Sequence, residues 1–296
     1  MEPTFIGIGS ARCGSTWLHR SLGLHPDVHM SDPKQICFFD RMIKKESLEW
    51  YWSHFDPPAG QATCPVRGEI TPFYARLSKR SVDSVLRLLP EIRVLLTIRN
   101  PVDRCWSAAH LDLGHYGGRQ LAMMNPSAFF RYFERQRVIR YTDYERIIDR
   151  WSSGSTSDRL HVERFEDIEE DPVGLLSRSL LHIGASSEWV APLEQVTQIV
   201  RPEGRDHQGV LMPESVRWYL SSKWIEPTRR LNHRLEGAVQ GWVDSMEEVL
   251  GDPVASWRLR GALTRCFEKV PEAASFWIYD QLNEWSIKRA WSRLGL

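Results

Sequence analysis

Near its beginning the chain reads TFIGIGSARCGSTW (residues 4–17), an apolar run followed by a glycine-rich segment and the start of a helical pattern. The apolar residues of 4–9 predict a short buried strand that ends in glycine. Residues 15–24 have the spacing of a helix, which we expect to stop at His25-Pro26. This order of strand, loop and helix is typical of a parallel βαβ unit.

The same alternation of strands and helices continues along the chain. Residues 93–99 form the clearest strand, because their continuous apolar run suits a sheet that is buried on both faces. Further strands are predicted at 66–70 and 160–165, and helices at 81–89, from Pro101 onward, at 128–151 and at 173–182. The predicted fold class is therefore α/β, a single domain with a central parallel sheet flanked by helices. We expect this domain to cover residues 1–245, and a helical C-terminal extension, residues 246–296, to pack on it.

Residues 9–16 have the spacing of a P-loop-like anion site. Glycines let the backbone wrap around an anion, and the N–H groups at the start of the following helix point toward it. The spacing fits the template G-x-x-x-x-G-K-[ST] except at Ser15, which replaces the lysine that reaches the β- and γ-phosphates of a triphosphate. A cation stands earlier, as Arg12. We therefore expect an anion other than a magnesium-bound triphosphate, and a simple glycine turn is the alternative.

A second motif follows the strand at residues 93–99. Arg99 lies at the carboxyl end of this predicted parallel strand, where ligands gather in open α/β sheets. The planar guanidinium of arginine suits a phosphate group. Ser107 lies about two turns into the next helix and can direct a hydroxyl donor at the same site. Together with the first loop, these residues predict two anion sites in one crevice.

These two motifs resemble those of sulfotransferases that use 3′-phosphoadenosine 5′-phosphosulfate (PAPS), especially the heparan sulfate sulfotransferases and their bacterial relatives. The resemblance extends over residues 4–245. It implies that the 5′-phosphosulfate is held by Arg12, Cys13, Gly14, Ser15, Thr16 and Trp17. It also implies that the 3′-phosphate is held by Arg99 and Ser107, and that a loop covering PAPS includes Gly204 and Arg205.

The residues that the resemblance places on the acceptor side depart from the family pattern. Gln35 occupies the position of the glutamate that is the usual general base, and a carboxamide has no useful basicity near neutral pH. Cys37 stands in place of a frequent histidine, and Ile70 in place of a frequent lysine. Arg12 itself stands where the family loop usually has lysine. The resemblance therefore implies a nearly intact PAPS site beside an altered acceptor site.

Three explanations of Gln35 stay open. In the first, another residue supplies the base, and the candidates are Glu69, placed ahead of the others, Asp40, His54 and His207. In the second, the acceptor needs little deprotonation, as a phenol or a nitrogen nucleophile would. In the third, the protein binds PAPS or its desulfated product PAP without catalysis. A structural role for Glu69, as a carboxylate satisfied by its neighbours, is an equally good reading of that residue.

The predicted reaction is the transfer of a sulfuryl group from PAPS to a hydroxyl, amine or phenol of a small-molecule or saccharide acceptor. We assign its catalysis to Arg12, Gln35 and Glu69. Lys34 either approaches the sulfuryl group or is a solvated surface lysine. Two alternatives are an inactive relative that binds PAPS or PAP, and a nucleotide kinase with a degenerate phosphate loop.

Composition limits the partners and the environment of the chain. Its 296 residues carry 38 basic and 38 acidic side chains, which argues against a protein that coats nucleic acid or an anionic membrane. No apolar run approaches the ~20 residues that span a bilayer, and no secretory leader opens the sequence, so we expect a cytoplasmic protein. The five cysteines show no metal-binding spacing and are expected to be reduced thiols. We predict no metal. The role of residues 246–296 stays open, and covering the acceptor pocket or forming the face of a homodimer are two possibilities.

Overall fold

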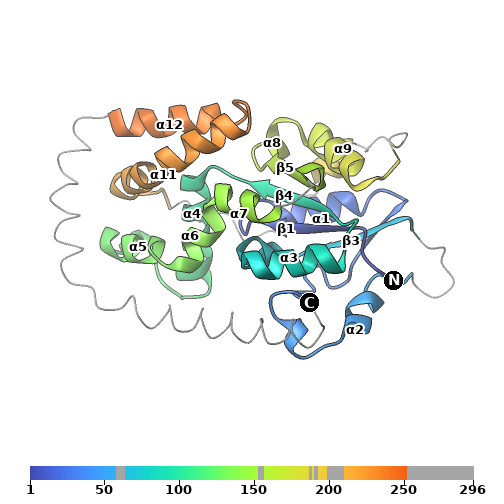
Figure 1. The fold of residues 1–296 in the computed structure, drawn as a ribbon. Coiled ribbons are helices and arrows are strands. Elements are labelled where there is room, and N and C mark those ends of the chain that lie inside the picture. Colours follow the sequence, from blue (N-terminus) through green and yellow to red (C-terminus); the bar gives the residue numbers. More distant parts are fainter. Residues whose placement is uncertain (58–63, 153–156, 187–188, 190–192, 199–209, 252–296) are drawn as a thin grey trace. The chain divides into compact units, whose positions relative to one another are not determined.

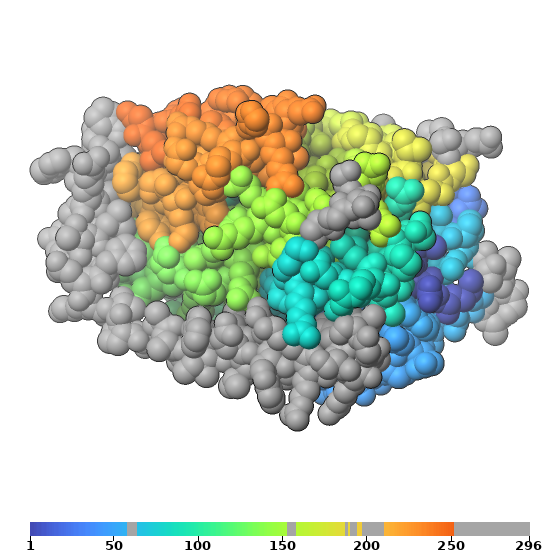
Figure 2. Space-filling view, in the orientation of Figure 1, coloured from blue at the N-terminus to red at the C-terminus, as the bar shows by residue number. Residues whose placement is uncertain are grey.

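The computed structural model describes residues 1–57, 64–152, 157–186, 189, 193–198 and 210–251, and the remaining residues are grey in Figures 1 and 2. The chain divides into two compact units. We call the first the sheet unit; it contains the described residues of Met1–Arg99 and Ile147–Glu203. The second, the helical unit, contains the described residues of Asn100–Arg146 and Gly204–Asp280.

A five-stranded parallel sheet is the centre of the sheet unit (Figure 1). Its strands are β1 (Phe5–Gly9), β2 (Val28–Met30), β3 (Val66–Ile70), β4 (Arg93–Ile98) and β5 (Leu160–Arg164). They lie in the order β2-β3-β1-β4-β5, so that every residue of the central strand β1 is buried. The predicted α/β fold class is confirmed, and each of the four predicted strands begins and ends within one residue of its predicted bounds.

Helices cover this sheet on two sides. They are α1 (Ser15–Leu22), α2 (Leu48–Ser53), α3 (Lys79–Leu88), α8 (Asp167–Glu170), α9 (Pro172–Ile183) and α10 (Leu193–Gln198), with the 3₁₀ helices η1 (Met42–Lys44), η2 (Pro72–Arg76) and η5 (Ser157–Arg159). Apolar side chains of α1 and α9 form one core cluster with those of β1, β3 and β4, while α3 lies on the opposite side of the sheet from α9 (Figure 1). Burial of this apolar surface is the main favourable contribution to the unit's stability.

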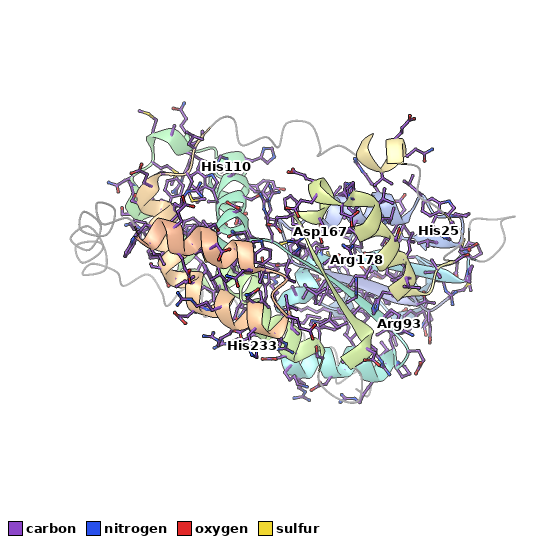
Figure 3. The ribbon with its side chains drawn as sticks, turned by 90° about the horizontal axis from the view of Figure 1, so that it is seen from above. His25, Arg93, His110, Asp167, Arg178 and His233 are labelled. Atoms are coloured by element: carbon purple, nitrogen blue, oxygen red, sulfur yellow. The ribbon has the colours of Figure 1, made fainter. Side chains whose placement is uncertain are left out.

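A network of charged side chains joins β5 to α8 and α9. Arg178 contacts three carboxylates: its Nη2 lies 2.9 Å from Glu163 Oε2 and 3.2 Å from Asp167 Oδ2, and its Nη1 lies 3.2 Å from Asp171 Oδ2. Asp167 and Arg178 are labelled in Figure 3, where they lie close together. Glu163 is buried, and its hydrogen bonds with His161 and Arg178 outweigh its burial, so that the pKa of its carboxyl group is lowered.

The helical unit contains α4 (Pro101–Ala109), the π-helical η3 (His110–His115), η4 (Leu121–Met123), α5 (Pro126–Phe133), α6 (Gln136–Thr142), α11 (Glu214–Arg234) and α12 (Gln240–Gly251). The single helix predicted over 128–151 is instead three helices, α5, α6 and α7 (Tyr144–Trp151). The chain leaves helical geometry at Arg135 and at Asp143. One straight helix has a single apolar stripe, whereas Phe129, Phe130 and Phe133 of α5 and Val138 of α6 are all buried, which requires the chain to bend between them.

The predicted division at residues 245 and 246 falls within helix α12. Residues 252–296 lie outside the described part of the chain, so the C-terminal extension and its packing stay predictions. Among the described helices, none has the length and apolar character needed to cross a lipid bilayer.

Candidate functional site

The loop between β1 and α1 is shaped by two glycines. Gly9 has a φ of 115°, and a Cβ added to it would lie 2.7 Å from the carbonyl oxygen of Pro72. Gly14 has a φ of 81°, and its added Cβ would collide with the side chain of Ile168. Arg12, between them, also has a positive φ of 74°. A larger residue at either glycine would therefore be strained both by its backbone conformation and by its neighbours.

Helix α1 begins directly after this loop, at Ser15. The first N–H groups of a helix have no partner within the helix, and Gly14, its N-cap residue, has no side chain to accept from them. These N–H groups and the helix dipole form a suitable site for an anion. The side chains of Cys13 and Trp17 are buried. The N–H of Cys13 donates to the carbonyl oxygen of Ser10 at 3.2 Å, so we expect Trp17 to offer its backbone N–H and Cys13 to shape the loop.

Two cationic side chains from distant parts of the sequence contact this loop. Lys34 Nζ donates hydrogen bonds to Ser15 Oγ, at 3.1 Å, and to Thr16 Oγ1, at 3.0 Å. Arg99 Nη1 donates to the carbonyl oxygen of Arg12 at 3.5 Å, and its guanidinium carbon lies 4.2 Å from the centre of the Phe165 ring. Of the two possibilities for Lys34 in the sequence, the structure therefore favours a lysine at the anion loop over a solvated one.

Gln35 follows Lys34 and is exposed. Glu69, which the sequence places first among the candidate bases, is completely buried at the end of β3. Its Oε1 accepts hydrogen bonds from the hydroxyls of Tyr51, at 2.9 Å, and Tyr74, at 2.7 Å. Its Oε2 accepts from the hydroxyl of Thr71, at 2.5 Å, and from the N–H of Ile36, at 3.2 Å. Burial raises the pKa of Glu69 to about 6, although these hydrogen bonds act in the opposite direction.

Two of the other candidate bases are also held by neighbouring groups. Asp40 is buried; burial raises its pKa to about 6, and Arg41 Nε lies 3.1 Å from its Oδ2. Its Oδ1 has no hydrogen-bond partner within the described part of the chain. His54 Nδ1 lies 2.9 Å from the carbonyl oxygen of Trp50. Burial raises the pKa of the half-buried Cys37 thiol to about 11, so this group is protonated at neutral pH.

Four further residues of the predicted site are assigned from the sequence alone. Ser107 belongs to the helical unit, where it is buried on α4. Gly204, Arg205 and His207 lie outside the described residues. Their roles stay predictions.

The hydrogen-bond partners of Glu69 are candidate site residues that the sequence did not identify. Thr71 and Tyr74 follow Glu69 closely in the sequence, but nothing in the spacing of Tyr51, on helix α2, connects it with a carboxylate 18 residues away. Among the described residues, no group of three or more His, Cys, Asp and Glu side chains is arranged to hold a metal ion.

Comparisons with known proteins agree with this geometry. A family model described as a sulfotransferase domain matches residues 2–201. Over 111 residues the chain is 30% identical to the membrane-associated sulfotransferase kil1 of Dictyostelium discoideum, covering 38% of this chain and 23% of that protein. Over 293 residues it is 24% identical to the human bifunctional heparan sulfate N-deacetylase/N-sulfotransferase 2, covering 86% of this chain and 30% of that protein.

The chain thus spans less than a third of the length of either relative. Among solved structures, a sulfotransferase from Alicyclobacillus acidocaldarius superposes with a TM-score of 0.63 at 21% identity, covering 82% of this chain and 99% of that one. At this level of identity the superposition supports the fold alone.

Proposed function

Because the chain belongs to the sulfotransferase domain family, we propose that it is an enzyme that transfers a sulfuryl group from PAPS to a small-molecule or saccharide acceptor. The observation that carries the proposal is the convergence of Lys34 and Arg99 on the loop at the start of α1. Two cations, an uncapped helix N-terminus and glycines without room for a side chain together suit a large anionic group.

The negative charge of PAPS suits the cations and N–H groups of this loop. It supplies a sulfuryl group that is already activated by its anhydride bond to phosphate. We assign the 5′-phosphosulfate to Arg12, Lys34 and the backbone N–H groups of residues 14–17, and the 3′-phosphate to Arg99 and Ser107. Gly204 and Arg205 are proposed to cover the bound nucleotide.

The same groups can stabilise the charge that develops during transfer. As the sulfuryl group leaves, negative charge increases on the bridging oxygen, and donors that are already in place stabilise it without reorganisation. We assign the stabilisation of the bridging oxygen to Arg12 and to the N–H groups of Ser15 and Thr16, and contact with the sulfuryl oxygens to Lys34. The remaining rate enhancement comes from holding the acceptor in line with the sulfur.

Deprotonation of the acceptor requires a separate explanation. Gln35 is exposed and can orient an acceptor through its amide, but it cannot remove a proton. Each oxygen of Glu69 already accepts two hydrogen bonds, and the residue has no exposed surface. These contacts favour a positioning role for Glu69 over that of a base. We therefore propose an acceptor that needs little deprotonation, an amine or a phenol, ahead of a simple alcohol.

Binding of PAP tests the cofactor site directly. PAP at about 100 times its dissociation constant stabilises a folded protein by ~2.7 kcal/mol, which raises the melting temperature by several degrees. We expect this shift with PAP and a much smaller one with adenosine 5′-phosphate, which lacks the 3′-phosphate. No stabilisation by millimolar PAP would contradict the proposal.

The exposed Gln35 also favours a second candidate function, an inactive relative that binds PAPS or PAP. Turnover of PAPS with a panel of amines, phenols and alcohols separates the two. PAP formation that depends on an acceptor supports the enzyme. Tight PAP binding without turnover of any acceptor supports the binding protein.

A further inference from the structure

The segment that follows Gln35 lacks regular secondary structure yet has well-defined hydrogen bonds. Residues 36–38 are in neither a helix nor a strand, so their backbone N–H groups need partners from elsewhere in the fold. The N–H of Ile36 donates to Glu69 Oε2 at 3.2 Å. The N–H of Cys37 donates to Thr71 Oγ1 at 3.2 Å, and that of Phe39 to the Tyr74 hydroxyl at 3.4 Å.

Both of these hydroxyls are themselves oriented by Glu69. Thr71 donates its single hydroxyl proton to Oε2 at 2.5 Å, and Tyr74 donates its proton to Oε1 at 2.7 Å. A hydroxyl has one proton, so a hydroxyl that donates to a carboxylate presents only lone pairs to its other neighbour. The carboxylate therefore fixes both hydroxyls as acceptors for the N–H groups of Cys37 and Phe39.

We infer that Glu69 is a positioning residue, which holds residues 36–39 through one direct and two relayed hydrogen bonds and thereby presents Gln35 to the acceptor. Gln35 is held on both sides, because Lys34 is bonded to the loop hydroxyls and Ile36 is bonded to Glu69. The part of this inference that concerns the acceptor rests on the proposed sulfuryl transfer. The hydrogen-bond network itself does not.

The hydroxyls that face Glu69 keep their protons, which is consistent with a carboxylate that only accepts hydrogen bonds. Tyr51 from α2 and Tyr74 from η2 have pKa values raised well above the usual range, first by burial and then by the charge of Glu69, so both hydroxyls keep their protons. The thiol of Cys37 is protonated for similar reasons, and the nearby Asp40 raises the pKa of both Cys37 and Tyr74 further. Protonation of Glu69 would leave one of its four donors without an acceptor, and the segment would lose part of its support.

We call the hydrogen bonds that Thr71 and Tyr74 pass from Glu69 to the N–H groups of Cys37 and Phe39 the relay. Phenylalanine substitutions of Tyr51 and Tyr74 form a matched pair of variants that tests it. Tyr51→Phe and Tyr74→Phe each remove one hydroxyl that donates to Glu69 Oε1, but only the hydroxyl of Tyr74 also accepts from Phe39. We expect Tyr74→Phe to speed hydrogen exchange at the Phe39 amide by about 3- to 10-fold, because one hydrogen bond is lost. Tyr51→Phe should leave the exchange rate of this amide unchanged. Equal exchange in the two variants would overturn the inference.

Thr71 offers the second arm of the experiment. Thr71→Val removes the hydroxyl that accepts from Cys37, whereas Thr71→Ser keeps it. We expect Thr71→Val to speed exchange at the Cys37 amide and to raise the KM for the acceptor, with the Kd for PAP unchanged, and Thr71→Ser to restore both values. A Thr71→Val variant with wild-type exchange would refute the relay. If exchange responds as expected but no acceptor is turned over, the network stands and the proposed reaction fails.

Discussion

Replacement of Lys34 by methionine removes one positive charge while nearly keeping the length of the side chain. The ammonium lies 3.1 Å from Ser15 Oγ and 3.0 Å from Thr16 Oγ1, at the start of α1. Under the proposed function it contacts the sulfuryl oxygens of PAPS, and PAP has no such group. A hydrogen bond to a charged group contributes about 1.5–3 kcal/mol, so we expect kcat/KM for PAPS to fall by about 10- to 150-fold.

The assay compares the two nucleotides on one protein. Steady-state rates at a fixed acceptor concentration give kcat/KM for PAPS, and titration calorimetry gives the Kd for PAP. Because PAP lacks the sulfuryl group, its affinity should change far less than the rate. Lys34→Arg should retain most of the activity, since it keeps a cation, and Lys45→Met is a matched control that removes an exposed lysine nearby in the sequence.

Two results would refute this reasoning. An equal loss of PAP affinity would mean that Lys34 only shapes the loop through Ser15 and Thr16. An unchanged kcat/KM would mean that the ammonium does not contact the sulfuryl group.

The remaining predictions concern the 3′-phosphate, the acceptor and the stability of the fold. Arg99→Ala should weaken the binding of PAP far more than that of adenosine 5′-phosphate in calorimetric titrations; equal weakening would argue against a 3′-phosphate site. Gln35→Glu, tested on an alcohol acceptor, should raise kcat by up to the ~10²–10⁴-fold that a general base contributes, and an unchanged rate would mean that position 35 does not face the nucleophile. Arg178→Ala should lower the free energy of unfolding in urea at pH 7 by about 1–3 kcal/mol, because it leaves the buried Glu163 with fewer partners. The pKa of Glu163 is lowered in the folded state, so its stabilising contribution is present above its usual pKa and is lost as the pH falls; the effect of Arg178→Ala should therefore diminish in acid, and a deficit that persists there would contradict this explanation.

The strands were predictable because their signals are local. Continuous apolar runs bounded by glycine or proline identify β1 and β4 from neighbouring residues alone. Strand β2 has only three residues, too few for a period to be recognised. The two breaks within residues 128–151 were not predicted, because charged residues continue through them without a glycine or proline. The change in direction of the apolar face at these breaks is visible only in the structure.

Less of the candidate site was predictable, because only part of it is formed by residues that are consecutive in the sequence. Glycine spacing and a helix start predict the position of the candidate anion loop, since both are consecutive in the sequence. The contact of Lys34 with this loop depends on how the chain returns from β2, which no motif encodes. For Glu69, residue type and position suggested a base, whereas its role depends on burial and on hydroxyl groups from three separate positions.

The close approach of Gly9 to Pro72 has a consequence for the order of events during turnover. The loop between β1 and α1 lies so close to the backbone that follows Glu69 that a Cβ added to Gly9 would be 2.8 Å from Pro72 Cα, and Gly9 itself has no side chain to absorb a displacement. We therefore expect a movement of one segment to displace the other. Binding of the nucleotide should then change the affinity for the acceptor, and binding of the acceptor should change the affinity for the nucleotide. Such coupling is reciprocal by thermodynamic necessity, so an acceptor that tightens nucleotide binding must itself be bound more tightly once the nucleotide is in place.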